Sequence, residues 1–332
     1  MPMGEISYQT GFGNQFATEA DPDVLPTGQN SPQKVSGGLY TEQLTGTAFT
    51  APRVSMQRSW MYRMRPSVRH LNNLQAVDSG LIRTSPDQNT SPTAAQLRWD
   101  PFPSVASDTT WLTGLATVAT NGNSEMQAGG AVHHFVASQS MGDTAFVDTD
   151  GELMLVPYDG QLLIKTEMGH LEVGPGHIAV IPRGVKFSVD LSTDGARGYV
   201  CENYGANFSL PEHGLVGVDA NALPRDFEYP IAAYDHDDRP TRLVAKISGQ
   251  LFSTELEHSP FDVVAWHGNL APYRYELRRF CALGPVVFDH PDPSIWTVLS
   301  SSSDTPGTAN LDFILFREHW RVAEHTFRPP WF

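Results

Sequence analysis

The stretch GELMLVPYDGQLLIKTEMGHLEVGPGHIAVIPRGVKFSVD, Gly151–Asp190, contains short runs rich in valine, isoleucine, leucine and phenylalanine. Glycine, proline and aspartate separate these runs at close intervals, and such residues form turns between strands. The stretch therefore predicts a meander of antiparallel strands, as found in β-sandwiches and jelly rolls. The predicted fold class is mainly β.

The rest of the chain supports this class. The 25 prolines and 28 glycines are scattered along the sequence, which indicates many short strands joined by turns. Between Tyr8 and Pro66, polar and aromatic residues mix without a sustained period, so we expect this segment to wrap over the main sandwich or to pair with its edges. Further strands are expected, for example over Ala131–Ser138 and Gly198–Tyr204.

The length of the chain predicts two domains. A sequence of 332 residues exceeds the size at which one hydrophobic core usually stops growing. After the aromatic stretch WHGNLAPYRYE, a break near Arg278–Arg279 is the expected junction between two domains. The first is a cupin-like or jelly-roll β-sandwich, residues 1–278 with the wrapping N-terminal segment, and the second begins in residues 279–332.

Charge and hydropathy exclude several classes of partner. The formal net charge of −15 repels nucleic acid and anionic membranes. No run of apolar residues approaches the roughly 18 to 20 that a membrane span needs, and no signal peptide is evident. The two cysteines, Cys201 and Cys281, have no metal-binding spacing, so we expect buried, reduced thiols and a cytoplasmic location.

Most of the 12 histidines lack the spacing of a metal site. His133 and His134 are adjacent on a predicted strand, where successive side chains point to opposite faces. His236 lies in an acidic stretch that reads as a surface loop. His177 follows a Gly-Pro-Gly turn and precedes a stretch similar to cupin barrels, but Phe187 and Ser188 stand where such barrels place a later metal histidine. The sandwich is therefore predicted to be cupin-like without the cupin metal.

His290 stands out, in the stretch Phe288–Trp296 beside Asp289, Asp292 and two prolines. A nearby carboxylate would support the imidazole as a base that accepts a proton from a phenol at neutral pH. Alternatively, His290 and Asp292 have the spacing of part of a facial triad of two histidines and one carboxylate that holds iron in oxygenases. A histidine in a proline-rich turn can also serve only to hydrogen-bond the backbone. The residues alone leave these three interpretations open.

Seven stretches, in order from end to end, resemble the homogentisate 1,2-dioxygenase family. They are Gly11–Asn14, Leu39–Thr50, Arg58–Arg63, Gln96–Trp99, Val264–Asn269, Asp289–Ser294 and Thr326–Pro330.

The resemblance implies a non-haem Fe(II) enzyme with an extradiol-type ring-cleaving activity. Such enzymes open the ring of homogentisate with O₂ to give maleylacetoacetate, in tyrosine and phenylalanine catabolism. The family fold is a large β-sandwich domain followed by a smaller cupin-like catalytic domain, assembled as homotrimers or dimers of trimers. By this resemblance His290 matches the histidine that accepts the proton of the substrate hydroxyl.

One departure from the family pattern concerns the iron. In the family, the stretch matching Thr326–Pro330 is followed by two aromatic residues and then by the first of the iron ligands, whereas this sequence ends at Trp331 and Phe332. The expectation is a chain that binds iron weakly or not at all, is inactive alone, and has no metal ligand to assign.

Two other interpretations compete with the incomplete enzyme. The chain could be a non-catalytic cupin-like module that binds a small molecule or a protein. It could also hold iron through His290, Asp292 and a distant histidine such as His267. A further expectation is that a basic patch offsets the acidic surface for an anionic substrate, made from Arg274, Arg278, Arg279 or Arg328.

Overall fold

The computed structural model describes residues 6–26, 35–70, 73–86, 94–95, 100, 107–211, 222–281 and 296–316. Strands dominate this part of the chain, and the helical pieces are the short 3-10 helices η1 (Ser36–Gly38), η2 (Ser67–Arg69), η3 (Pro224–Asp226) and η4 (Leu277–Arg279). Within these residues, no helix has the length and apolar character needed to cross a membrane. The mainly β class is confirmed.

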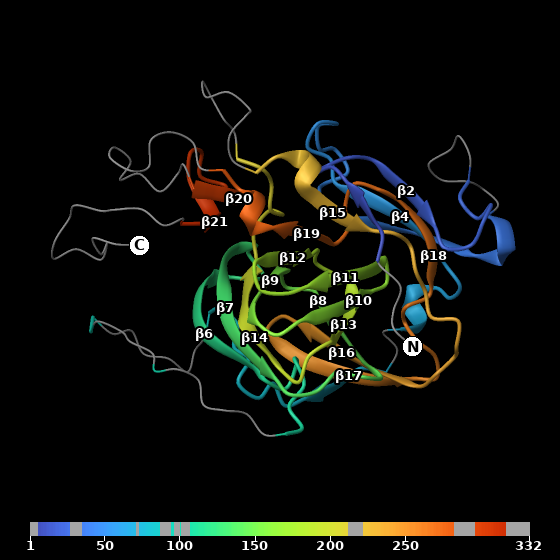
Figure 1. Ribbon diagram of the computed structural model, residues 1–332, viewed down its shortest axis with the longest axis horizontal. Helices are drawn as coiled ribbons and strands as arrows, with labels where there is room; N and C mark the ends of the chain where they lie inside the picture. The colour runs from blue at the N-terminus through green and yellow to red at the C-terminus, as the bar shows by residue number, and fades with distance from the viewer. Residues whose placement is uncertain are drawn as a thin grey trace.

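Two large sheets form the body of the molecule (Figure 1). The eight-stranded sheet has the order β1 (Tyr8–Thr10), β15 (Phe227–Pro230), β19 (Tyr273–Glu276), β12 (His177–Ile181), β9 (Glu152–Asp159), β14 (Ala196–Asn203), β7 (Ala128–Ala137) and β6 (Leu115–Asn123). The seven-stranded sheet has the order β11 (Gly169–Val173), β10 (Leu162–Thr166), β13 (Lys186–Leu191), β8 (Thr144–Asp148), β16 (Thr241–Ile247), β17 (Gln250–Leu256) and β5 (Gln75–Val77).

An aromatic core lies between these sheets. Trp111, Phe135, Phe146 and Phe187 are fully or almost fully buried, and the Trp111 and Phe187 ring centroids are 5.4 Å apart in an edge-to-face arrangement. Aromatic pairs of this kind add to the large free energy gained when their apolar surface leaves water. The sandwich architecture that the sequence predicts is therefore held by a packed aromatic centre.

The Gly151–Asp190 stretch is not a simple meander. It forms strands as expected, but β9 pairs with β12 in one sheet, while β10 pairs with β11 and β13 in the other. The chain crosses between sheets at Gly160, whose φ of 78° suits glycine and whose Cβ would meet the Gly195 carbonyl oxygen at 2.1 Å. This alternation between sheets is that of a jelly roll, and periodicity alone could not reveal it.

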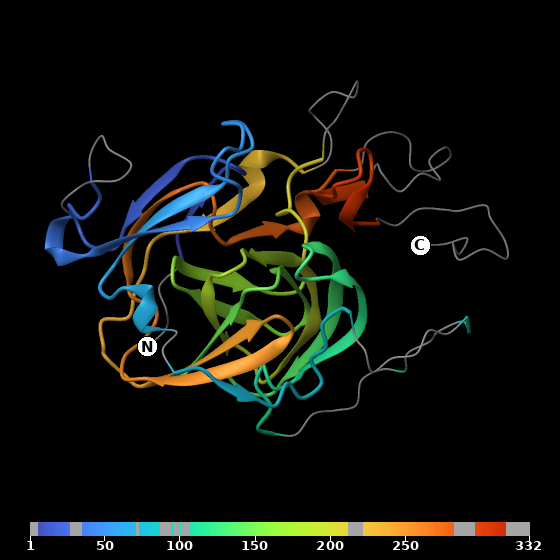
Figure 2. The same ribbon diagram turned by 180° about the vertical axis from the view of Figure 1, so that it is seen from behind.

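The segment that begins at Tyr8 wraps the sandwich as predicted. Its first strand, β1, pairs with β15 at the sheet edge. The later strands of this segment join β18 (Val263–Gly268), from near the other end of the chain, in a separate four-stranded sheet. Its order is β2 (Phe16–Glu19), β18, β4 (Arg58–Arg63) and β3 (Tyr40–Thr45). Figures 1 and 2 show this small sheet lying against one end of the sandwich.

Buried charges join the small sheet to the sandwich. The Arg63 guanidinium contacts Glu167 at 2.5 Å and Asp262 at 3.4 Å, and Lys186 lies 3.2 Å from Glu167. Burial opposes ionisation of Glu167, but Lys186 and Arg63 outweigh it and lower the pKa of this carboxyl to about 2. The network fixes the position of β4 because separating its members would leave buried charges without partners.

The hairpin of β20 (Thr297–Ser302) and β21 (Ala309–Ile314) packs against the eight-stranded sheet. Asn310 accepts a hydrogen bond from the Gly129 backbone amide at 2.6 Å, and Val298 and Leu299 belong to the main core. The division between residues 1–278 and 279–332 stays a prediction.

Candidate functional site

The proposed base, His290, lies outside the described residues, as do Asp289, Asp292 and the 326–332 stretch. Its three possible roles therefore remain open. The histidine suggested as a distant iron ligand, His267, is on β18, where its Nε2 atom lies 2.9 Å from the Tyr62 hydroxyl.

The adjacent histidines point to opposite faces of β7, as predicted. His133 is buried and hydrogen-bonds to Glu202 at 2.9 Å and to Thr117 at 2.8 Å. His134 faces outward and contacts the Tyr158 hydroxyl at 2.6 Å. The two rings cannot share a metal ion.

One group of three metal-ligating side chains occurs within the described residues, namely Asp148, Asp150 and Glu202, with ligand atoms within 4.8 Å of one another. The Lys246 ammonium already occupies the position that a metal ion would take there. It lies 2.8 Å from Asp150, 2.5 Å from Glu202 and 3.9 Å from Asp148. Oxygenase iron prefers two histidines and one carboxylate with open positions. This closed, carboxylate-rich cluster does not fit such an iron, and we assign it a structural role.

The expected basic patch is wrong for the three arginines that the structure describes, because acidic neighbours neutralise each of them. Their pairs are Arg274–Glu228 at 2.7 Å, Arg278–Glu276 at 2.5 Å and Arg279–Asp226 at 3.2 Å. The expectation of two buried thiols is also wrong, since Cys281 is exposed and Cys201 only partly buried.

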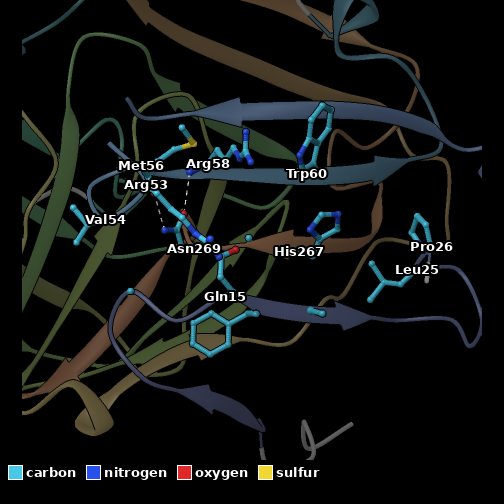
Figure 3. A pocket seen from close by; sticks show the side chains of 14 residues that line it. Gln15, Leu25, Pro26, Arg53, Val54, Met56, Arg58, Trp60, His267 and Asn269 are labelled. Carbon is cyan, nitrogen blue, oxygen red and sulfur yellow. Dashed lines mark hydrogen bonds between the residues drawn. The ribbon is translucent and has the colours of Figure 1, made fainter. Parts of the chain in front are cut away.

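A large cleft opens instead on the outer face of the four-stranded sheet, with a volume of about 1180 Å³. Figure 3 shows the residues that line it. They are Gly13, Gln15, Phe16, Ala17, Leu25, Pro26, Arg53, Val54, Met56, Arg58, Trp60, His267, Gly268 and Asn269.

The antiparallel pairing of β4 and β18 creates the floor of this cleft. Trp60 lies opposite His267 in the strand register, and Arg58 is two residues before Trp60. Since alternate side chains share one face of a strand, all three project from the same side of the sheet. The chain thus brings residues about two hundred positions apart onto one surface.

Asn269 holds one wall of the cleft in place. Its side-chain oxygen accepts a hydrogen bond from the Arg58 backbone amide at 3.0 Å, and its side-chain nitrogen donates to the Met56 carbonyl at 2.9 Å (Figure 3). Ser59 adds a clamp, since its hydroxyl donates to the Leu270 carbonyl at 2.6 Å. These bonds satisfy backbone groups where the strand ends, so the loop before β4 keeps a defined position.

The cleft was missed from the sequence, although the signal was present. The stretches Gly11–Asn14, Leu39–Thr50, Arg58–Arg63 and Val264–Asn269 all lie in or beside this sheet. The first three belong to the segment between Tyr8 and Pro66, in which polar and aromatic residues mix without a sustained period. Their shared location shows that the unusual composition belongs to one surface.

A smaller pocket, which shares Gly13 and Asn269 with the cleft, is lined by a buried carboxyl group, Glu152. Glu152 accepts a hydrogen bond from the Phe208 amide at 2.7 Å. Burial raises the pKa of Glu152 to about 8, although the Phe208 amide and nearby Arg183 act to lower it. A carboxyl whose pKa is higher in the folded than in the unfolded state contributes its full stability at pH values below its unfolded-state pKa. For Glu152, this contribution is lost as the pH rises from the ordinary pKa of 4.5 through about 8.

Glu152→Gln is therefore expected to remove part of the alkaline destabilisation. At pH 9 the variant should be more stable than the wild type by on the order of 3 kcal/mol, because the amide stays neutral. Urea unfolding at pH 5, 7 and 9 measures this. Glu255→Gln, at an exposed position of β17, is the control and should leave the pH dependence unchanged; an unaltered slope in Glu152→Gln would refute the assignment.

Comparison with known proteins identifies the family of this chain. The family models described as homogentisate 1,2-dioxygenase N-terminal and C-terminal match residues 7–277 and 278–332. Proteins called homogentisate 1,2-dioxygenase from Rhodopseudomonas palustris (strain BisA53) and Nitrobacter hamburgensis are 54% and 53% identical over 325 residues, which cover 98% of this chain and 72% of each relative. A cupin 2 conserved barrel domain protein from Leptotrichia buccalis matches 48% of this chain and 85% of its own at 10% identity, with a TM-score of 0.23 that is too low to support an argument. The chain belongs to the homogentisate 1,2-dioxygenase family.

Proposed function

We propose that this chain takes part in Fe(II)-dependent, extradiol-type cleavage of homogentisate by O₂, giving maleylacetoacetate in tyrosine and phenylalanine catabolism. The observation that carries the proposal is the match at 54% identity across 325 residues, with both family models matched. Homogentisate and O₂ are the small-molecule partners, and a homotrimer or dimer of trimers in the cytoplasm is the proposed setting.

Fe(II) would supply the route for electron transfer that ground-state O₂ needs to react with an aromatic ring. The described residues do not offer a fitting site, since Lys246 fills the one acidic cluster found among them. We therefore propose that the described sandwich supports the reaction as a scaffold for a site outside the described residues.

His290 is proposed to accept the proton from a phenolic hydroxyl of homogentisate. Deprotonation makes the ring richer in electrons, and an imidazole is suited to this transfer near neutral pH. His290→Asn should reduce kcat by roughly a hundredfold to ten-thousandfold while bound iron stays unchanged.

The measurement for His290 is turnover together with iron content, in whichever preparation consumes O₂ with homogentisate. His236→Asn, at an exposed loop position, is the control and should change neither quantity. Loss of iron together with activity would identify His290 as a ligand rather than a base.

O₂ uptake tests the proposed function. The protein is assayed with homogentisate and added Fe(II) under reducing conditions. We expect O₂ uptake that needs both additions. Absence of uptake from the folded protein would favour the alternative, a non-catalytic cupin-like binding module.

A further inference from the structure

The cleft on the four-stranded sheet has an unusual charge for this protein. The sequence holds 37 acidic and 22 basic side chains, yet the cleft lining includes Arg53 and Arg58 and no aspartate or glutamate. Neither guanidinium has an ion-pair or side-chain hydrogen-bond partner among the residues that the structure describes. A concave surface with two uncompensated positive charges concentrates anions.

Flat apolar surfaces lie beside these charges. Trp60 and His267 line the cleft, and the His267 ring is held by the Tyr62 hydroxyl. Figure 3 shows Arg58 and Trp60 on one strand with His267 on the next. An aromatic ring of a ligand binds favourably against such side chains because apolar surface leaves water. A guanidinium beside the ring can bind a carboxylate through a bidentate pair of hydrogen bonds.

Trp60 also offers a hydrogen-bond donor without an acceptor. Its Nε1 atom is buried and has no partner within the described part of the chain. Because an indole N–H can only donate, an oxygen atom of a ligand that reached it would satisfy it. Arg58 and Trp60 are therefore the lining residues that offer donors to oxygen atoms of a ligand.

We propose that this cleft is a binding site for an aromatic carboxylate anion, with the carboxylate on Arg58 and Arg53 and the ring against Trp60. Nothing in this binding needs iron or turnover. Homogentisate is one member of the class, so the proposal rests on the proposed function only for the identity of the natural ligand.

Binding of phenylacetate to the iron-free 332-residue protein tests the proposal, by ligand-observed NMR titration in the presence of a chelator. Acetate, which lacks the ring, and 2-phenylethanol, which lacks the charge, are the comparison probes. We expect saturable binding of phenylacetate and at least roughly tenfold weaker binding of both probes, because each loses one half of the recognition.

Variants identify the site. Arg58→Gln keeps the backbone amide that bonds Asn269 and should weaken phenylacetate binding roughly tenfold to a hundredfold. Arg53→Gln should act in the same direction, and Trp60→Phe, which keeps an aromatic ring but loses the donor, should weaken binding roughly threefold to tenfold. Arg242→Gln, an exposed arginine on β16 outside the cleft lining, is the matched control.

The proposal is overturned if the wild type shows no saturable binding, or if Arg53→Gln combined with Arg58→Gln binds phenylacetate as the wild type does. Circular dichroism of each variant confirms that the fold is kept. Because the assay contains no iron, its failure would leave the proposed ring cleavage untouched, and an inactive enzyme would leave the binding result standing.

Discussion

Lys246→Met is expected to lower the free energy of unfolding by about 4 kcal/mol, because it leaves buried carboxylates without their cation. Lys246 is 2% exposed, and its ammonium lies near Asp148, Asp150 and Glu202. Burial alone would lower the pKa of Lys246, but these carboxylates outweigh it and raise that pKa, so the ammonium stays charged. For the Asp148 carboxyl, burial acts in the opposite direction and raises the pKa.

Urea unfolding of Lys246→Met measures this loss. Lys165→Met is the matched control, since Lys165 pairs with Asp190 at 2.6 Å at a more exposed position of β10. A partly exposed pair contributes about 1 kcal/mol or less, so the control should change little. An effect in Lys246→Met no larger than in the control would show that the acidic cluster does not depend on its lysine.

Gly268→Ala is expected to destabilise the protein by about 3 kcal/mol and to abolish phenylacetate binding at the cleft. Gly268 has a φ of 142°, and a Cβ there would lie 2.3 Å from the Arg58 carbonyl oxygen and 2.5 Å from the Ser59 Cα. Both atoms belong to the backbone of β4, so the strand itself would have to move. That movement would separate Arg58 and Trp60 from His267.

Gly80→Ala serves as the control for backbone strain alone. Gly80 has a φ of 57°, and nothing lies within 4 Å of a Cβ built there. Gly80→Ala should lower the free energy of unfolding by about 1 kcal/mol and leave phenylacetate binding unchanged. Chemical denaturation and the phenylacetate titration are measured for both variants; equal effects would mean that the approach of β18 to β4 is looser than the structure indicates.

The sequence was sufficient for the class of fold but not for its topology. In Gly151–Asp190 the apolar runs and turn residues predict strands correctly, because burial of both faces and tight turns leave a local signature. Which strand pairs with which depends on contacts distant in sequence. The pairing of β9 with β12, and the parallel pairing of β8 with β16, therefore had no local signal.

The candidate site shows the same limit. His133 and His134 could be separated from the sequence because the period of a strand is fixed at two. By contrast, the role predicted for Arg274 failed because its partner, Glu228, lies on another strand and is recognised only in three dimensions. Arg58 became a candidate when its strand was found beside His267, whereas His290 stays a prediction from family resemblance.

Oxygen-isotope labelling tests the central claim most directly, since it separates ring cleavage from the simple oxidation of homogentisate to a quinone. The protein that shows homogentisate-dependent O₂ uptake is supplied with ¹⁸O₂, and the product is examined by mass spectrometry. The dioxygenase account predicts a ring-opened product that has gained both oxygen atoms of one O₂ molecule. A quinone without label, or a product carrying a single labelled atom before exchange with water, would contradict it.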